Sequence, residues 1–420
     1  MNNATVSTTL MCEQTSPWRD DFPTLSLRFG DKPLVYLDSA ASAQTPNVVI
    51  ERMQGFYQSE YASVHRSIHQ LSSAATENME AVRDKVQHFI GAASREEIVF
   101  TKGATESINL VANSFLRPML QQATAPIEIV ISQLEHHANI VPWQLLAELY
   151  PFTIKVWPVN PQGQLELAQL EPLLSHQTRL IALAHVSNVL GLRTPIESVI
   201  KLAKSRGIAV LIDGAQAVMH EALNVEQLGC DFYVFSAHKL YGPTGVGVLY
   251  AQRQHLDTMT PWQGGGAMID EVSLPYGTTY HTAPWKFEPG TPNIAGILGM
   301  GAALDYLQQI GIDSIAHHEA DLMSYALDAL SKVPNMRLFG EGFTRKGVVA
   351  FNLGLHHSYD VGALLDHYGI AIRTGHHCAQ PLLAALGESS VCRASIAMYS
   401  NRADIDALVN GLVRIAALLD

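Results

Sequence analysis

Short apolar runs alternate with amphipathic segments along most of this chain. The runs that we expect to form strands are 97–101, 127–132, 179–186, 208–212 and 232–235. Because they are apolar at nearly every position, they predict strands buried on both faces. Apolar residues at helical spacing predict helices over 48–57, 75–90 and 195–206, with Gly91 as the stop signal of the second. This alternation predicts an α/β fold whose mainly parallel sheet is covered by helices on both sides.

A second region with a different pattern follows Asn293. A long helical pattern comes first, and the segments expected after it are helix 313–332, strand 348–353, helix 360–368, strand 370–374 and a final helix from Asp404. We therefore expect a large domain over 33–300 and a smaller α+β C-terminal domain over 301–420. Residues 1–32 are expected to form a tail and a short segment that packs with the small domain.

Composition narrows the class of protein. A chain of 420 residues, 47% of them hydrophobic, can bury a large core. Its net charge of -12 argues against nucleic acid or an anionic membrane surface as a partner. No run approaches the roughly 20 apolar residues that span a bilayer, and residues 1–16 lack the basic and apolar regions of a signal peptide.

The cysteines point to a reducing compartment. Cys12, Cys230, Cys378 and Cys392 are far apart and form no CxxC pair. Such spacing is poor material for a disulfide framework or an iron–sulfur cluster. We therefore expect a cytoplasmic protein.

Two strand ends carry residues that suit pyridoxal 5′-phosphate (PLP). Lys239 follows the run 232–235 and precedes a Gly-Pro break, and Asp213 directly follows the run 208–212. Ligands of parallel sheets collect outside the carboxyl ends of the strands. There the lysine would form a Schiff base, and the aspartate would keep the pyridine nitrogen protonated. A surface lysine and a strand-end cap explain each residue alone, but the two together with Cys378 favour the cofactor.

A phosphate cup is expected where Gly103 to Ser107 open a helix after the strand that ends at Thr101. Free backbone N–H groups there, with the hydroxyl of Thr105, bind anions. Ser236 and His238, which flank the lysine segment, could complete the cup. An ordinary helix cap is the alternative.

Two further polar residues follow strands. His136 could stack on a planar cofactor ring and shuttle protons near neutral pH. Asn188 could donate to the phenolic oxygen of the cofactor or to a substrate carboxylate. A buried histidine bonded to a carbonyl and a loop-capping asparagine are the alternatives.

The third chemical element is Cys378, in a glycine-containing loop beside His376 and His377. A cysteine in such a place can be a reactive thiolate. Arg393 lies fifteen residues further on and offers bidentate recognition of a carboxylate. Alternatively, Cys378 is a small buried hydrophobe, or it binds zinc together with the two histidines, although no second ligand pair accompanies them. We expect no metal.

With these motifs the chain resembles the group II cysteine desulfurases of the SufS type, in the class V branch of the fold-type I PLP enzymes. The resemblance runs from about Pro23 to the C-terminus. The segments that carry it are Tyr36-Leu37-Asp38-Ser39-Ala40-Ala41, Val64-His65-Arg66, Glu135-His136-His137-Ala138-Asn139, Asp213-Gly214-Ala215-Gln216, His238-Lys239, Gly264-Gly265-Gly266, Glu288-Pro289-Gly290-Thr291-Pro292-Asn293 and Arg373-Thr374-Gly375-His376-His377-Cys378.

The resemblance implies a role for each matching position. Lys239 would be the Schiff-base lysine, His136 the ring-stacking histidine and Cys378 the sulfur acceptor. The other implied roles are ring contacts for Asp213 and Gln216, phosphate contacts for Thr105, Ser236 and His238, binding of the substrate carboxylate for Arg393 and Asn188, and lining of the entrance for Arg373 and His65. Thr291 would reach the phosphate from the partner subunit of a homodimer.

Two positions depart from the family pattern. Ala104, in the phosphate-binding segment, replaces a frequent threonine and would cost one phosphate contact. Ala237 replaces the usual glycine before His-Lys, so we expect its methyl group close to the cofactor, with a small adjustment and no loss of activity.

The activity that the resemblance implies is removal of sulfur from L-cysteine. The products would be L-alanine and a persulfide on Cys378, which is passed to a SufE-like acceptor protein for iron–sulfur cluster assembly. L-Selenocysteine is a further possible substrate. A selenocysteine lyase or a kynureninase-like enzyme would use the same lysine and aspartate without Cys378, and a non-enzymatic thiol or zinc scaffold would need neither.

Overall fold

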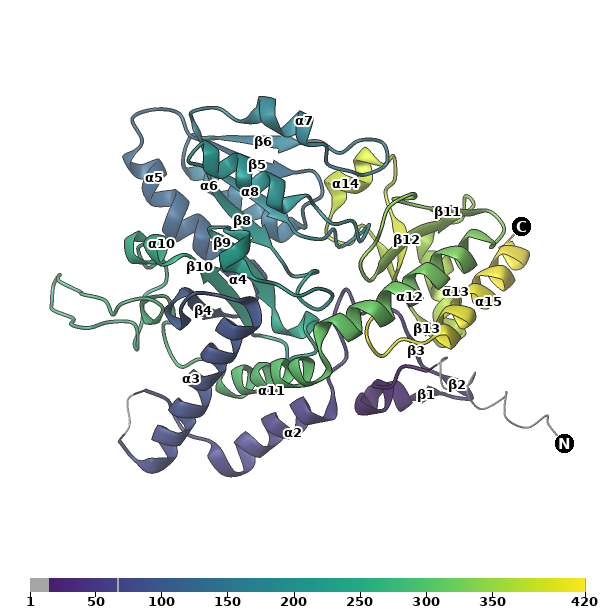
Figure 1. The fold of residues 1–420 in the computed structure, drawn as a ribbon, viewed down its shortest axis with the longest axis horizontal. Helices are drawn as coiled ribbons and strands as arrows, with labels where there is room; N and C mark the ends of the chain where they lie inside the picture. The colour runs from purple at the N-terminus through teal and green to yellow at the C-terminus, as the bar shows by residue number, and fades with distance from the viewer. Residues whose placement is uncertain (1–14, 66–67, 420) are drawn as a thin grey trace.

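The computed structural model describes residues 15–65 and 68–419 (Figure 1). Cys12 lies outside these residues. The chain forms a larger sheet and a smaller sheet, and each is packed against helices. The helices beside the smaller sheet lie near the C-terminus.

The larger sheet has seven strands in the order β4-β10-β9-β8-β7-β5-β6. β10 runs antiparallel to both of its neighbours, and every other pair in this sheet is parallel. The prediction of a mainly parallel sheet is therefore confirmed. The strands are β4 (Ile98–Thr101), β5 (Glu128–Ser132), β6 (Thr153–Trp157), β7 (Thr178–Ala184), β8 (Ala209–Asp213), β9 (Phe232–Ser236) and β10 (Gly247–Ala251). All five strands expected in this region are present, with ends shifted by one or two residues.

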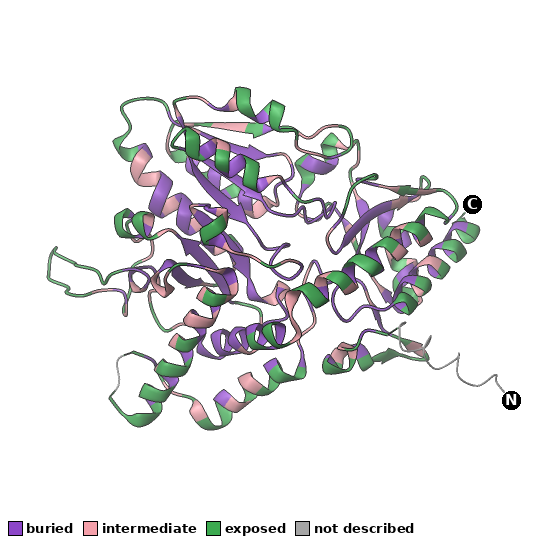
Figure 2. Cartoon of the chain, in the orientation of Figure 1, coloured by how far each residue is buried: buried purple, intermediate pink, exposed green. Residues whose placement is uncertain are grey.

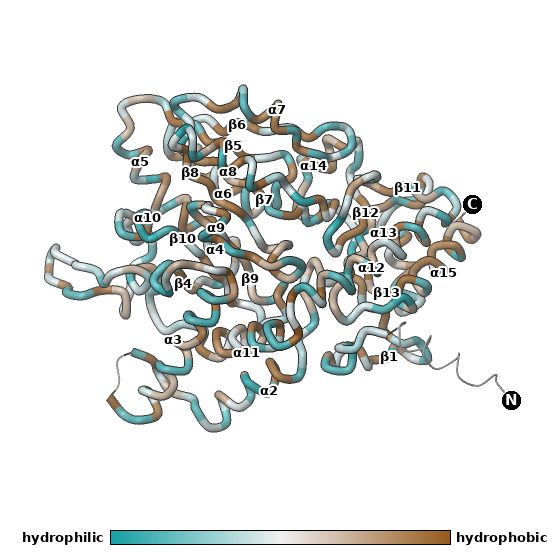
Figure 3. The backbone as a smooth tube through the Cα atoms, in the orientation of Figure 1, coloured by the Kyte–Doolittle hydropathy of each residue, from teal (hydrophilic) through white to brown (hydrophobic). Residues whose placement is uncertain are grey.

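Helices cover both faces of this sheet, which explains why its strands are apolar throughout. In β8, Val210 and Ile212 pack with α3 (Gln70–Ile90), α8 (Ile196–Ser205) and α11 (Ile294–Ile310). Ala209 and Leu211 face the opposite layer, made by α4 (Ala104–Val111), α6 (Val141–Leu149) and α10 (Arg253–Thr258). Figure 2 shows the strands buried between more exposed helices, and Figure 3 shows that these strands are also hydrophobic.

The smaller sheet is antiparallel, with the order β11-β12-β15-β14. Its strands are β11 (Met336–Leu338), β12 (Val348–Leu353), β14 (Arg373–Gly375) and β15 (Val391–Ser395). Its core also contains residues of α12 (Ile312–Ser331), α13 (Ser358–His367) and α15 (Arg402–Leu419). The domain boundary expected between 300 and 301 lies inside α11, and it stays a prediction.

One expected strand is in fact two. The segment 370–374 splits into β13 (Ile370–Ala371), which pairs with β3 (Val35–Tyr36), and β14, which pairs with β15. The pattern analysis also missed β6, β10, β11 and β15. In β15 a charged residue, Arg393, interrupts the apolar pattern, although it is 2% exposed.

The first described residues cross to the C-terminal part of the chain. The Ser16 hydroxyl donates to the Met398 carbonyl, and Arg19 forms an ion pair with Asp404 at 2.8 Å. The remaining elements are β1 (Arg28–Phe29), β2 (Lys32–Pro33), α2 (Asn47–Gly55), α5 (Arg117–Gln122), α7 (Leu167–Leu170), α9 (Val225–Leu228) and α14 (Gln380–Ala385).

Candidate active site

Most of the predicted site residues line one cavity of ≈ 220 Å³. It lies at the carboxyl ends of the parallel strands, where β14 and β15 of the smaller sheet meet them. Its predicted members are Ala104, Thr105, His136, Asn188, Asp213, Ser236, His238, Lys239, Arg373 and Arg393. The structure thus brings together residues from both sheets that are up to 289 positions apart, from Ala104 to Arg393.

Lys239 and Asp213 lie on neighbouring strands of this cavity. Asp213 is the last residue of β8, and Lys239 ends a single turn that follows β9. Burial lowers the pKa of the Lys239 amine to about 8, although Asp213 opposes this shift, and Arg393 and Arg373 add to it. Burial raises the pKa of Asp213, while the N–H of Ala215, which donates to Oδ1 at 3.0 Å, and the charge of Lys239 favour its ionised form. The lysine is therefore prepared to lose its proton.

The turn after Asp213 is fixed by close packing. A Cβ atom on Gly214 would lie 2.1–2.2 Å from atoms of the Tyr233 ring. Tyr233 is fully buried, and its hydroxyl bonds His185 Nδ1 at 2.9 Å. Only glycine fits here, and the aspartate is held at the cavity wall.

The predicted phosphate cup depends on the strand that sequence reasoning missed. β10 lies between β4 and β9, and its Gly247 pairs with both Thr101 and Ser236. A Cβ on Gly247 would lie 2.3 Å from the Cα of Gly103. This close approach places the Ala104 N–H 2.8 Å from Ser236 Oγ, at the N-terminus of α4.

His136 lines the cavity as a neutral ring. Its Nδ1 accepts from the Ala138 N–H at 3.0 Å, so the tautomer carries its proton on Nε2. Burial, together with the neighbouring charge of Lys239, lowers the pKa of His136 to about 3. Burial in the same way lowers the pKa of His238 to about 4. Both imidazoles are uncharged near neutral pH.

Arg393 is buried and held from two sides. Its Nη2 forms a 3.0 Å ion pair with Asp38, and its Nη1 donates to the Asn188 carbonyl at 2.9 Å. Its Nε has no hydrogen-bond partner among the residues that the structure describes. A buried, incompletely satisfied guanidinium in a cavity wall is suited to bind a carboxylate.

The Asn188 amide is used differently from the expectation. Its Nδ2 donates to the carbonyl of His377 at 2.7 Å, next to Cys378. Asn188 still lines the cavity, so its predicted contact with cofactor or substrate stays a prediction.

Cys378 is partly exposed and does not line the cavity, whereas its neighbour His377 does. The cysteine therefore lies at the rim. Cys230 and Cys392 are fully buried free thiols, and burial raises the pKa of both. The expectation that these two are inert fits their burial.

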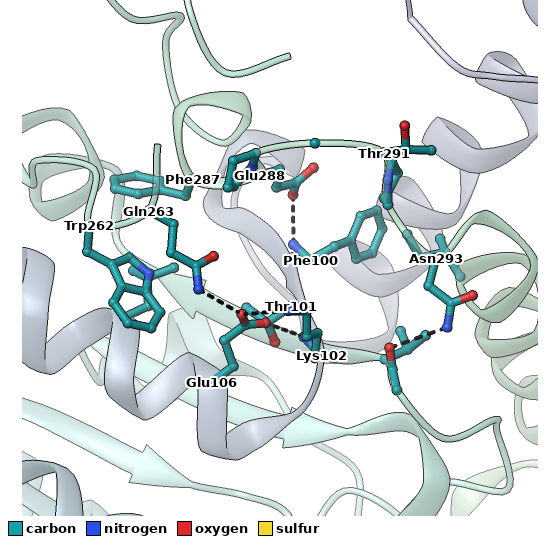
Figure 4. A pocket seen from close by; sticks show the side chains of 17 residues that line it. Phe100, Thr101, Lys102, Glu106, Trp262, Gln263, Phe287, Glu288, Thr291 and Asn293 are labelled. Carbon is teal, nitrogen blue, oxygen red and sulfur yellow. Dashed lines mark hydrogen bonds and ion pairs between the residues drawn. The ribbon is translucent and has the colours of Figure 1, made fainter. Parts of the chain in front are cut away.

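Three other predicted residues lie outside this cavity. Gln216 is buried, and its side-chain amide donates to the Ala40 carbonyl at 2.8 Å. His65 lines a separate cavity beside Glu288. Thr291 lines a third cavity, whose wall includes Trp262, Phe100 and Glu106 (Figure 4). Neither His65 nor Thr291 is among the residues that line the cavity with Lys239.

Ala237 packs differently from the expectation, and the contact of its methyl group with the cofactor stays a prediction. Its side chain belongs to the hydrophobic core and is fully buried, and it is not part of the cavity wall. The Ala237 N–H donates to the Val246 carbonyl. The hydroxyl oxygen of the preceding Ser236 accepts from the Ala104 N–H. The methyl group of Ala237 therefore packs in the core and not in the cavity wall.

Two functional candidates were missed. One is Asp38, which forms an ion pair with Arg393 and to which the sequence assigned no role. Glu135 precedes His136, is fully buried, and accepts from the Asn139 amide at 2.6 Å and from the Ala184 N–H at 3.0 Å. Burial raises the pKa of Glu135 to about 7. The signal that could have identified Glu135 is its position shortly after the end of an apolar strand.

Comparison with known proteins agrees with this geometry. The family described as "Aminotransferase class-V" matches residues 35–408. The chain belongs to this family.

Two relatives in this family are close over almost the full length. A cysteine desulfurase of Serratia proteamaculans is 55% identical over 401 residues, which are 96% of this chain and 98% of the relative. A cysteine desulfurase of Dickeya dadantii is 57% identical over 96% of each chain. The crystal structure of the cysteine desulfurase CsdA from Escherichia coli has a TM-score of 0.87 at 42% identity and covers 96% of this chain and 98% of its own. The fold-type I expectation is confirmed.

Two properties of the described residues complete the picture. Within 15–65 and 68–419, no group of three or more His, Cys, Asp or Glu side chains is placed to hold a metal ion. No helix in the same residues has both the length and the apolar composition needed to cross a membrane.

Proposed function

We propose that this class V family member is a PLP-dependent cysteine desulfurase that converts L-cysteine to L-alanine. The observation that carries this function is the placement of Lys239 and Asp213 in one cavity with a cysteine loop at its rim. The relatives that are 55% and 57% identical over almost the whole chain bear the same name.

The donor set of the cavity fits PLP from end to end. Asp213 supplies a carboxylate for the pyridine nitrogen, and the neutral ring of His136 supplies a stacking surface. At the other end, Thr105, Ser236 and the start of α4 offer hydroxyl and N–H groups for the phosphate. Lys239 lies in the same wall as the group for covalent attachment. When bound, PLP supplies an electron sink for negative charge at the carbons of the substrate.

The residues around the cavity then divide the remaining tasks. The Lys239 amine, with a pKa lowered to about 8, takes the proton from the substrate Cα. Arg393, held by Asp38, binds the substrate carboxylate, and Arg373 lines the entrance. His136 stays neutral and offers its Nε2–H as a hydrogen-bond donor.

Cys378 is the sulfur acceptor in this proposal. Its thiolate attacks the sulfur of the substrate, so that an S–S bond forms while the substrate C–S bond breaks. The electron pair of the broken bond stays with the substrate Cβ, which takes a proton, and the proton held by Lys239 returns to Cα, so that alanine results. Cys378 carries the persulfide at the partly exposed rim, where a second protein can reach it.

The finer assignments belong to the same proposal. We propose a SufS-type enzyme that works in the cytoplasm and passes its persulfide to a SufE-like acceptor for iron–sulfur cluster assembly. The position of Thr291 outside the cavity that contains Lys239 supports a homodimer in which Thr291 serves the phosphate of the partner subunit, and His65 is proposed to line the entrance. The division at 300/301 into two domains and the ring contact of Gln216 are retained as proposals.

The test is replacement of the thiol, Cys378→Ala, with the exposed Ser389→Ala as a matched control from the same region. The Cys378 variant should keep its yellow cofactor absorbance and lose alanine formation from L-cysteine, and the control should match the wild type. Undiminished turnover of L-cysteine would refute the role of Cys378. Retained cleavage of L-selenocysteine by this variant would show lyase chemistry that does not need the thiol. Addition of a small persulfide acceptor tests the partner assignment.

A further inference from the structure

The loop that carries Cys378 has an unusual backbone. His377 and Cys378 have φ angles of +50° and +54°. Residues with a Cβ atom rarely adopt this left-handed conformation, because it brings the Cβ atom too close to the backbone. Two in succession persist only where surrounding contacts enforce them. The contacts around this loop therefore decide where the thiol lies.

Some of these contacts come from the loop and its own sheet. The Cys378 N–H donates to Nδ1 of His376 at 3.0 Å, and the Ala379 N–H donates to the His376 carbonyl at 2.9 Å. Nε2 of His377 lies 3.0 Å from the Val391 carbonyl of β15. These bonds shape the turn, but they do not fix it to the wall of the cavity.

His137, in the turn that follows β5 of the larger sheet, contacts the loop at two points. The His137 N–H donates to the Cys378 carbonyl at 2.7 Å. The Nε2 atom of the same residue accepts from the Gln380 N–H at 3.3 Å, beyond the cysteine. Asn188 adds a third contact through its bond to the His377 carbonyl. His137 thus contacts the chain at the cysteine itself and two residues after it.

We propose that His137 is a positioning residue that clamps the Cys378 loop to the cavity through these two bonds. This role rests on the proposed function of Cys378 as the sulfur acceptor. It differs from the role of His136, whose ring lines the cavity, since His137 is not part of the cavity wall.

The clamp is itself anchored from behind. His137 begins a single turn, His137–Asn139, and the Asn139 N–H donates to the His136 carbonyl at 2.8 Å. The Asn139 side chain bonds Glu135 at 2.6 Å and accepts from the Trp143 indole N–H at 3.0 Å. Trp143 and Glu135 are fully buried. Hydrogen bonds to buried residues therefore hold in place the turn that carries His137.

The ring of His137 is in the right form to accept. Burial lowers the pKa of His137, and the neighbouring His376 lowers it further, with the two ring centroids 5.6 Å apart. A neutral imidazole with its proton on Nδ1 leaves the lone pair of Nε2 for the Gln380 N–H. A protonated ring would have no acceptor to offer.

The experiment compares His137→Ala, His137→Gln and the remote, exposed His317→Ala in the holoenzyme. A glutamine oxygen can accept from the Gln380 N–H, whereas alanine cannot. For His137→Ala we expect kcat for L-cysteine to fall up to about tenfold, with little change in KM, because one hydrogen bond is lost. His137→Gln should recover most of this loss, and His317→Ala should match the wild type.

A second readout needs no turnover. Without substrate, alkylation of Cys378 by iodoacetamide, followed by mass spectrometry of its peptide, should be severalfold faster in His137→Ala than in the wild type or His137→Gln. Equal alkylation and kcat in His137→Ala and the wild type would overturn the clamp, and so would a glutamine variant as impaired as the alanine variant. Failure of the proposed function would instead appear as full activity of Cys378→Ala.

Discussion

The cavity has two halves that are built in different ways. The strand-end half contains Lys239, Asp213, His136 and Ser236, each at or just after the end of a parallel strand. The cysteine-loop half contains Arg373, His377 and Arg393, with Cys378 at its rim, and it is carried by a small antiparallel sheet. In the first half, packing against a large core sets the positions. In the second, individual hydrogen bonds across the cavity set them.

The two halves also differ in how tightly their functional groups are packed. Asp213 is fixed by a glycine that fits under a buried tyrosine ring. Cys378 has a partly exposed side chain and a left-handed backbone that is held by hydrogen bonds rather than by packing in a core. In the proposed function, the groups that bind the cofactor gain from rigidity, whereas a thiol that takes sulfur from one molecule and passes it to another must be accessible. The two halves suit these two tasks.

The largest effect that tests this contrast is loss of the lysine. Lys239→Ala should abolish turnover, because no other amine lines the cavity wall in the residues that the structure describes. The bound cofactor should no longer be attached covalently after borohydride reduction, as mass spectrometry of the intact protein would show. The exposed Lys201→Ala is the matched control and should behave as the wild type. Residual turnover in Lys239→Ala would mean that the strand-end half does not carry the chemistry.

A smaller effect tests the rigidity of the strand-end half. Gly214→Ala forces a methyl group to within 2.2 Å of the Tyr233 ring, whose hydroxyl bond to His185 resists displacement. Overpacking of this kind should lower the free energy of unfolding by about 1–3 kcal/mol, measured by denaturant titration. Gly264→Ala, where the added methyl group meets nothing within 4 Å, should leave stability almost unchanged. Equal stability of the two variants would show that the wall is softer than the packing implies.

The same contrast explains what could be predicted from the sequence. The strands that deliver Lys239 and Asp213 are continuous apolar runs, so both the strands and the meeting of these two residues at one cavity were predictable. β15 was missed because it contains Arg393, and an arginine is typical of the surface. Here its bonds to Asp38 and Asn188 make burial of the charge possible. The break at Ile372 was missed because the pairing partners of β13 and β14 lie in different sheets. Tertiary contacts between distant segments decide both cases.

The smallest effect concerns Ala237, next to the lysine segment. Because its methyl group packs in the core and not in the cavity, Ala237→Gly should cost about 1 kcal/mol of stability through lost burial and added backbone entropy. Steady-state turnover of L-cysteine should stay the same. Ala203→Gly in α8, which also loses a fully buried methyl group of this core, is the matched control for the loss of stability. A change in kcat specific to Ala237→Gly would place the methyl group in contact with the cofactor and would make the strand-end half less rigid than its packing indicates.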